Sequence, residues 1–133
     1  MIMKKRAFTL IELLIVISII GILVAIASVS YASIQKRSRD SRRIQDMKAI
    51  QNAFEQYYGD NNAYPTGCSL STTYLPSGIP SDPKSSGLYV YSGSSCVAAG
   101  YCYCALLEAG GGNATNSTCT LGSGSYYCVK PLQ

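Results

Sequence analysis

The most constraining feature of this sequence is a long apolar run near its amino terminus. From Leu13 to Gln35 no residue is charged, and most positions are Leu, Ile, Val or Ala. A helix of this length and composition crosses most of the hydrocarbon core of a bilayer. Three basic residues (4–6) precede the run, and one carboxylate, Glu12, lies at its leading end. A carboxylate that faces lipid at mid-depth costs about 3 kcal/mol, so we expect Glu12 to have a partner.

Two ordinary interpretations of this segment compete with a retained, assembling helix. A cleavable secretory signal also has a basic start and an apolar centre, and Ala25-x-Ala27 offers a signal peptidase small residues. The run exceeds the usual length of about 7–15 residues, and a secretory signal does not require Glu12. A plain single-pass anchor is the second interpretation. Because five basic residues in 36–43 follow the span, the positive-inside rule alone would place the carboxyl side in the cytoplasm.

The cysteines decide the orientation. An even number of cysteines in a small polar segment after an export signal predicts disulfides, which require an oxidising compartment outside the cytoplasm. Zinc is disfavoured because Cys102-x-Cys104 lacks the usual ligand spacing and the chain has no His. We therefore expect no metal and no cofactor. The six predicted disulfide cysteines are Cys68, Cys96, Cys102, Cys104, Cys119 and Cys128.

Composition also excludes several classes of function. The sequence has no His, no Gly-x-Ser-x-Gly motif and no pairing of a cysteine with a base, so we do not expect an enzyme. The formal charge of +4 falls to about +1 when residues 1–7 are removed, because three of the eleven basic residues lie there. Direct binding of nucleic acid is therefore not expected.

Helical periodicity resumes after the apolar run. An apolar stripe at steps of three and four predicts an amphipathic helix, which Gly59 and Pro65 are expected to end. The predicted stripe is Ile34, Ile44, Met47, Ile50, Phe54 and Tyr57, beside Ala49 and Ala53, with Arg43, Gln45, Asp46, Lys48, Asn52, Glu55 and Gln56 on the opposite face. The charged residues of 36–43 are expected to face solvent and lipid headgroups, or to pair with acids of neighbouring subunits.

Beyond residue 60 the chain is rich in Gly, Ser, Thr and Tyr, and its candidate strands are Leu88–Tyr91, Tyr101–Leu107 and Ser125–Val129. Strand alternation places Cys102 and Cys104 on one face and the intervening tyrosines on the other, so these two cysteines should have different partners. Cys119 and Cys128 are a plausible pair across a turn at 121–124, although six cysteines allow fifteen connectivities. The eight tyrosines after residue 60 are expected to pack the helix rather than to form a binding surface.

These patterns predict an α+β fold: a long amino-terminal helix, membrane-spanning in its first half and amphipathic in its second, packed on a small antiparallel sheet held by disulfides. The expected divisions are a basic leader at 1–7, an apolar helix at 8–35, its amphipathic continuation at 36–59 and a globular head at 60–133.

Two stretches resemble a known family. The run Ala7-Phe8-Thr9-Leu10-Ile11-Glu12-Leu13-Leu14 resembles the processing site of type IV pilins and of the pseudopilins of type II secretion. The stretch 51–66, and more loosely the sequence to residue 91, is similar to the end of the long helix and the following loop in that family. The resemblance implies cleavage between Ala7 and Phe8, N-methylation of Phe8, and an assembly role for Glu12 with the Phe8 amino group of a neighbour. Many members have Gly where this chain has Ala7.

The resemblance also implies a function and partners. The chain would be a structural subunit of a homo-oligomeric type IV pilus-like filament, or alternatively a major pseudopilin of type II secretion, or a minor or tip pilin with a binding head. Its partners would be a prepilin peptidase and methyltransferase, an inner-membrane assembly platform and a motor. It would reside in the cytoplasmic membrane as a single-pass precursor with the head outside, and then in a cell-surface filament.

Overall fold

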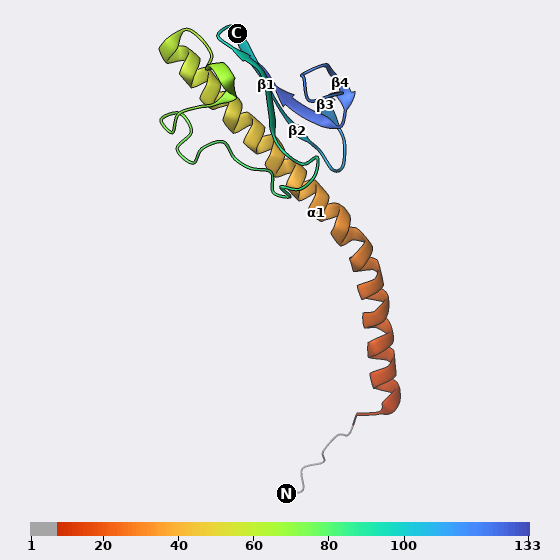
Figure 1. Cartoon of the computed structure of the whole chain (residues 1–133). Helices are drawn as coiled ribbons and strands as arrows, with labels where there is room; N and C mark the ends of the chain where they lie inside the picture. The colour runs from red at the N-terminus through yellow and green to blue at the C-terminus, as the bar shows by residue number, and fades with distance from the viewer. Residues whose placement is uncertain (1–7) are drawn as a thin grey trace, which may run out of the picture. The chain divides into compact units, whose positions relative to one another are not determined.

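The computed structural model describes residues 8–133, apart from the side chains of residues 29 and 30 (Figure 1). These residues form two compact units, which divide after Gln35. The amino-terminal unit ends at Gln35, and the head unit is Lys36–Gln133. One long helix, α1 (Leu10–Asn61, 52 residues), contributes to both units. The head unit also contains a short 3₁₀ turn, η1 (Thr66–Cys68).

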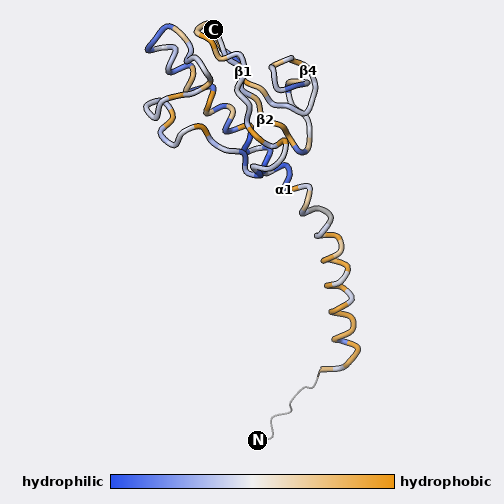
Figure 2. The backbone as a smooth tube through the Cα atoms, viewed as in Figure 1, coloured by the Kyte–Doolittle hydropathy of each residue, from blue (hydrophilic) through white to orange (hydrophobic). Residues whose placement is uncertain are grey.

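In the amino-terminal unit, α1 exposes its apolar side chains on every side. The large apolar residues from Leu10 to Ile26 are about half exposed or more, from 47% at Val16 to 83% at Leu10. Figure 2 shows this segment as an almost continuous apolar stretch. Of the residues that the structure describes, α1 is the one helix long and apolar enough to cross a membrane. Because this part of the helix has no polar face, it is suited to surroundings of lipid or of other helices rather than of water.

The carboxyl end of α1 lies two residues beyond the predicted stop at Gly59. Gly59 remains helical, and Asn62 takes the left-handed conformation (φ 52°) that ends the helix. Its N–H donates to the carbonyl of Tyr58 at 2.8 Å, and the side-chain amide of Asn61 donates to the carbonyl of Tyr57. Asn tolerates this conformation better than most residues, so it replaces Gly as the terminating residue.

The sheet of the head unit has five antiparallel strands in the order β1-β2-β5-β3-β4. Strand β2 pairs with β1 on one side and with β5 on the other, where Cys104 lies opposite Cys128. The strands are β1 (Ser92–Val97), β2 (Gly100–Leu106), β3 (Gly112–Ala114), β4 (Leu121–Gly124) and β5 (Tyr126–Val129). The predicted strands at 101–107 and 125–129 are therefore confirmed, within a residue, as β2 and β5.

Two other predictions about the sheet are wrong, and one strand has no counterpart in the prediction. Residues 88–91 are not a strand, because pairing with β2 begins only at Ser92. Residues 121–124 are not a turn but the strand β4, which pairs with β3. The short strand β3 is absent from the prediction, because its sequence Gly-Asn-Ala carries no strand signal of its own.

The core of the head unit lies between α1 and one face of the sheet (Figure 1). Met47, Ile50 and Phe54 are fully buried against this face. The ring of Phe54 lies 4.3 Å from that of Tyr101, centroid to centroid, and 6.0 Å from that of Tyr103. Burying one such side chain contributes about 1.5–3 kcal/mol, so the middle of the predicted stripe holds helix and sheet together. The fold class is the predicted one.

The ends of the predicted stripe and its polar face differ from the prediction. Ile34 is 61% exposed, and Ala49 also lies on the exposed side. Arg43, predicted to face solvent, is completely buried. Asp46 accepts a hydrogen bond from the hydroxyl of Tyr91 at 2.6 Å, and Glu55 accepts hydrogen bonds from the hydroxyls of Tyr64 and Tyr101. The head can cover Asp46 and Glu55 because its tyrosine hydroxyls donate hydrogen bonds to these two carboxylates.

Three disulfides hold the head unit. Cys68–Cys96 joins η1 to β1, Cys102–Cys119 joins β2 to the segment before β4, and Cys104–Cys128 joins β2 to β5. Cys102 and Cys104 thus have different partners, as predicted. The suggested pair of Cys119 with Cys128 is wrong, because each of them bonds to the cysteine face of β2 instead. Each bridge typically contributes about 2–4 kcal/mol, mainly by restricting the unfolded chain.

Candidate functional site

The residues singled out from the sequence lie in separate parts of the chain. Phe8 and Glu12 belong to the amino-terminal unit, and the six cysteines belong to the head unit. Ala7, which precedes the predicted cut, lies outside the described residues. Two regions are therefore candidates for a functional site: the start of α1, and the contacts between α1 and the loops of the head unit.

At the start of α1, Thr9 and Glu12 form a capping box. The backbone N–H of Thr9 donates to Glu12 Oε2 at 2.9 Å, and the Thr9 hydroxyl donates to the same oxygen at 2.7 Å. In return the N–H of Glu12 donates to Thr9 Oγ1 at 3.3 Å. This reciprocal arrangement satisfies backbone donors that a helix start otherwise leaves unpaired. The spacing Thr-x-x-Glu in the sequence is the signature of a capping box. In the prediction from sequence, however, Glu12 has only an intermolecular partner.

The capping box leaves Glu12 able to bind a second group. Both hydrogen bonds from Thr9 reach Oε2, and within residues 8–133 no donor reaches Oε1. Phe8 is 81% exposed immediately before the box. An exposed carboxylate oxygen beside the positive end of a helix can accept a hydrogen bond from an ammonium group of another molecule.

The second region is a buried ion cluster, defined here as Arg39, Asp40, Arg43, Asp82, Lys84 and Glu108. Arg43 is at its centre and is completely buried. Its guanidinium donates to both oxygens of Asp82, at 2.6 and 2.8 Å. It also donates to Asp40 Oδ1 at 2.7 Å and to Glu108 Oε1 at 2.9 Å. A buried guanidinium is stable only when its donors are matched in this way.

The other members connect the cluster to the loop after β2. Arg39 donates to both oxygens of Glu108, at 2.7 and 2.8 Å, and Lys84 Nζ lies 3.7 Å from Glu108 Oε2. Asp40 accepts the backbone N–H groups of Glu108 and Ala109 at 2.9 and 2.8 Å. One turn of α1 is therefore fixed both to the loop that contains Asp82 and to the loop after β2.

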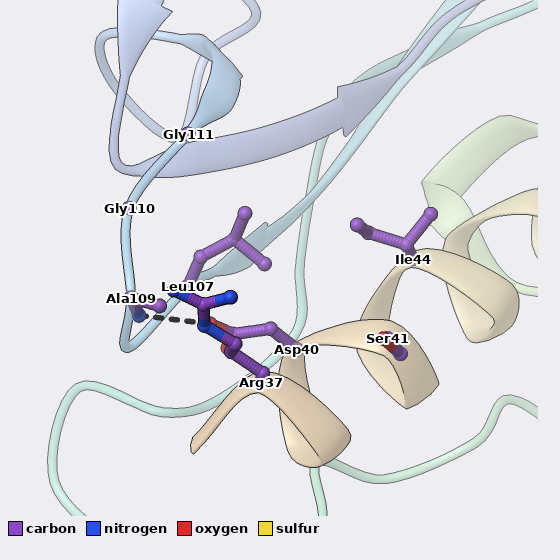
Figure 3. A pocket seen from close by; sticks show the side chains of 8 residues that line it. All are labelled: Arg37, Asp40, Ser41, Ile44, Leu107, Ala109, Gly110 and Gly111. Atoms are coloured by element: carbon purple, nitrogen blue, oxygen red, sulfur yellow. Dashed lines mark hydrogen bonds between the residues drawn. The ribbon is translucent and has the colours of Figure 1, made fainter. Parts of the chain in front are cut away.

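A cleft of about 400 Å³ opens beside the cluster (Figure 3). In the close-up, Asp40 extends from α1 toward Ala109, and a dashed line marks the hydrogen bond between them. No buried side-chain N or O atom among the described residues lacks a hydrogen-bond partner. The residues that line the cleft are Arg37, Asp40, Ser41, Ile44, Leu107, Ala109, Gly110 and Gly111.

The electrostatics of the cluster favour its charged form. Hydrogen bonds from Arg39 lower the pKa of Glu108 to about 2, although burial opposes this shift. Burial raises the pKa of Asp82, but the hydrogen bonds from Arg43 and from the backbone N–H of Lys84, together with the positive charge of Arg43, outweigh burial in sum, so the net pKa is lowered. The pKa of Arg43 is raised, chiefly by its bonds to Asp82. The ring of Tyr89 lies against two of the cations, with Arg43 Cζ 4.8 Å and Lys84 Nζ 4.2 Å from its centroid.

The cluster corrects the prediction for residues 36–43. Only part of this basic stretch faces solvent, since Lys36, Arg37 and Arg42 are exposed whereas Arg43 is buried. The sequence carried one signal for this outcome: Arg43 precedes Met47 by four residues and so continues the apolar stripe toward the amino terminus.

The pKa of Glu108 leads to a pH prediction. Because the folded state lowers this pKa, ionised Glu108 stabilises the fold above about pH 4.5, and the contribution is lost as the pH falls toward about 2. We expect the unfolding free energy of the wild-type chain to fall across this range, and that of Glu108→Gln to fall less. The measurement is denaturant unfolding of the full chain in detergent at a series of pH values. Asp60→Asn, at an exposed acid without an ion pair among the described residues, should keep the wild-type slope. Superimposable profiles of Glu108→Gln and wild type would contradict the assignment.

Comparison with known proteins identifies the family. Residues 2–28 match the family model described as the prokaryotic N-terminal methylation motif. The chain is 41% identical over 61 residues to the type IV major pilin protein PilA of Myxococcus xanthus, a match that covers 46% of this chain and 28% of that protein. It is 35% identical over 63 residues to the type II secretion system core protein G of Escherichia coli, covering 47% and 43% respectively. The chain belongs to the type IV pilin and pseudopilin family.

A further relative matches a longer part of the chain. The chain is 35% identical over 92 residues to the protein named "Probable minor fimbrial protein" of Dichelobacter nodosus, a match that covers 69% of this chain and 52% of that protein. The chain thus spans about a quarter to a half of the length of these relatives. The matched segment contains Phe8, Thr9 and Glu12, so the capped start of α1 lies within it.

Proposed function

We propose that this pilin-like chain is a structural subunit of a type IV pilus-like filament, assembled through the first half of α1. One observation carries the proposal: a methylation motif leads directly into a helix whose apolar side chains are exposed on every side. Such a surface needs either lipid or other helices around it. A subunit that moves from membrane to filament core meets each of these environments in turn.

In this proposal each part of the chain has a role. Residues 1–7 are a leader that is removed between Ala7 and Phe8, and Phe8 becomes the N-methylated first residue. Residues 8–35 span the inner membrane and later form the filament core, whereas 36–59 and 60–133 form the outer, extracytoplasmic head. A prepilin peptidase and methyltransferase process the precursor, and an assembly platform with a cytoplasmic motor drives its extraction from the membrane.

Glu12 sets the register between subunits in this proposal. In the membrane its carboxylate caps its own helix through Thr9. In the filament its second oxygen, Oε1, would accept a hydrogen bond from the Phe8 amino group of a neighbouring subunit. Leaving either charge unpaired in an apolar core is costly, so pairing selects one axial position for each new subunit.

Two alternatives rest on specific similarities. The match to core protein G supports a role as the major pseudopilin of a type II secretion system. The longer match to the Dichelobacter nodosus protein, which is named a probable minor fimbrial protein, supports a minor pilin, the class to which a tip pilin with a binding head would belong. The presence of Glu12 favours a subunit of the filament shaft, because the proposed charge pairing is needed at every repeat.

Sheared surface filaments from the native organism test this proposal. We expect quantitative mass spectrometry of the sheared fraction to find this chain as the main protein. A tip subunit would instead be present at a small fraction of the level of another pilin. Absence of the chain from all filaments, with the chain retained as a membrane protein, would overturn the structural-subunit proposal.

A further inference from the structure

We propose that the head unit, when its disulfides are reduced, contains a tetrathiolate site for one soft divalent cation such as Zn²⁺. The site is formed by Cys102, Cys104, Cys119 and Cys128, whose sulfur atoms all lie within 4.8 Å of one another. In the folded oxidised chain these four atoms form two disulfides. Disulfide and metal site are therefore alternative states of the same four sulfurs.

The arrangement of the sulfurs is close to that of a zinc site. Zn–S bonds of about 2.3 Å place the sulfurs of a tetrahedral site about 3.8 Å apart. The Sγ of Cys104 lies 3.6 Å from that of Cys102 and 3.8 Å from that of Cys119, although neither pair is bonded. The two disulfides share no sulfur, so they occupy opposite edges of the four-sulfur figure. These two edges must lengthen when the bonds are broken, and the remaining edges, which are at most 4.8 Å, must adjust toward about 3.8 Å.

Backbone pairing also brings the four residues together. Cys102 and Cys104 lie on one face of β2, and Cys128 lies opposite Cys104 in the β2–β5 ladder. Cys119 belongs to a short loop that is closed by the hydrogen bond from the N–H of Thr115 to the carbonyl of Thr120. Sheet pairing that survives reduction therefore keeps all four thiols within reach of one ion.

The environment selects the class of ion. Cys102, Cys104 and Cys128 are buried and Cys119 is half buried. The four sulfurs are the only metal-ligand group that the described residues bring together, and they include no carboxylate. Thiolates favour Zn²⁺ and Cd²⁺ over Mg²⁺ and Ca²⁺, which prefer oxygen ligands. The site is absent from the sequence motifs because Cys119 and Cys128 reach the pair in β2 only through the fold.

The chemistry balances with an added reductant. Each disulfide takes up two electrons and two protons to give two thiols, and a phosphine supplies the electrons while it is oxidised to its oxide with oxygen from water. The cation then displaces the thiol protons and binds the thiolates. Removing the cation in the presence of an oxidant restores the two disulfides. The third disulfide, Cys68–Cys96, packs with the other core cluster and has no part in the site.

Titration of the full chain in detergent, reduced with a phosphine under anaerobic conditions, tests the site. Co²⁺ is the probe, because tetrahedral thiolate coordination gives intense charge-transfer and visible absorption. We expect one Co²⁺ per chain, displaced by an equimolar amount of Zn²⁺. The double variant Cys68→Ser, Cys96→Ser should behave as wild type, whereas Cys102→Ser, Cys119→Ser should lose stoichiometric binding. Equal binding by the two double variants, or none by the wild type, would overturn the proposal.

Thiol alkylation supplies a second readout that separates a folded site from unfolded thiols. With Zn²⁺ bound to the reduced chain, an alkylating reagent should label Cys68 and Cys96 while the other four cysteines remain protected. Without metal, all six should be labelled. Labelling of the four proposed ligands in the presence of saturating Zn²⁺ would contradict the assignment.

Discussion

Replacing Glu12 by Ala is expected to abolish filaments while the processed subunit accumulates in the membrane. The substitution removes the carboxylate whose Oε1 accepts no hydrogen bond from the described residues, and it leaves the apolar surface for membrane insertion unchanged. An unpaired ammonium would then remain in an apolar filament core, which is strongly unfavourable. Electron microscopy of sheared material and immunoblotting of the membrane fraction give the two readouts.

Two further variants separate intermolecular pairing from helix capping. Glu12→Gln keeps a residue that can complete the capping box but removes the charge, so we expect it to lose filaments as well. Thr9→Val removes the hydroxyl from the box and keeps the carboxylate, so filaments should persist. Abundant filaments formed by Glu12→Gln would show that the charge of this residue is not required for assembly.

Replacing Arg43 by Met is expected to lower the unfolding free energy of the chain by about 3–5 kcal/mol. The side chain is completely buried, and its removal deprives Asp82, Asp40 and Glu108 of hydrogen bonds at once. Asp82 is the most affected, because it loses two hydrogen bonds from Arg43, whereas Asp40 and Glu108 each lose one. Denaturant unfolding of the full chain in detergent, followed by near-ultraviolet circular dichroism of the buried tyrosines, measures the change.

Arg42 is the matched control for this prediction. It is adjacent in sequence, carries the same charge and is exposed, so Arg42→Met should change stability by no more than about 0.5 kcal/mol. Arg43→Lys keeps a cation but cannot form the two-point contact with Asp82, and it should lie between wild type and Arg43→Met. A loss of less than 1 kcal/mol in Arg43→Met would contradict the structural role of the cluster.

Periodic patterns explain which parts of the fold are predictable from sequence. The apolar helix, the stripe from Met47 to Phe54, and strands β2 and β5 each follow from regular spacing of apolar residues. The alternation in 101–104 correctly separates a tyrosine face, which packs on α1, from a cysteine face, which forms disulfides. These features are local, so the sequence contains them directly.

Strands β3 and β4 illustrate what local patterns miss. Glycines are typical of turns, but the glycines in these two strands are required because neighbouring strands approach them closely. A Cβ on Gly112 would lie 2.0 Å from the carbonyl oxygen of Tyr126, and a Cβ on Gly124 would lie 2.2 Å from that of Ala114. Such contacts depend on the arrangement of the whole sheet.

The ion cluster was missed for a related reason. Charged residues are mostly exposed, so the sequence pattern places Arg43 on the solvent face. Its partners Asp82 and Glu108 lie 39 and 65 residues away, and no spacing rule connects them. The capping box of Thr9 and Glu12, by contrast, follows a three-residue spacing and was predictable.

The amino-terminal mass of the mature protein tests the central claim most directly. Intact-mass and peptide mass spectrometry of the exported chain should find a protein that begins at Phe8, carries one added methyl group on its amino nitrogen and retains the entire apolar helix. A mature chain that begins near residue 28, with the apolar helix removed, would contradict the account and leave a small secreted domain held by disulfides.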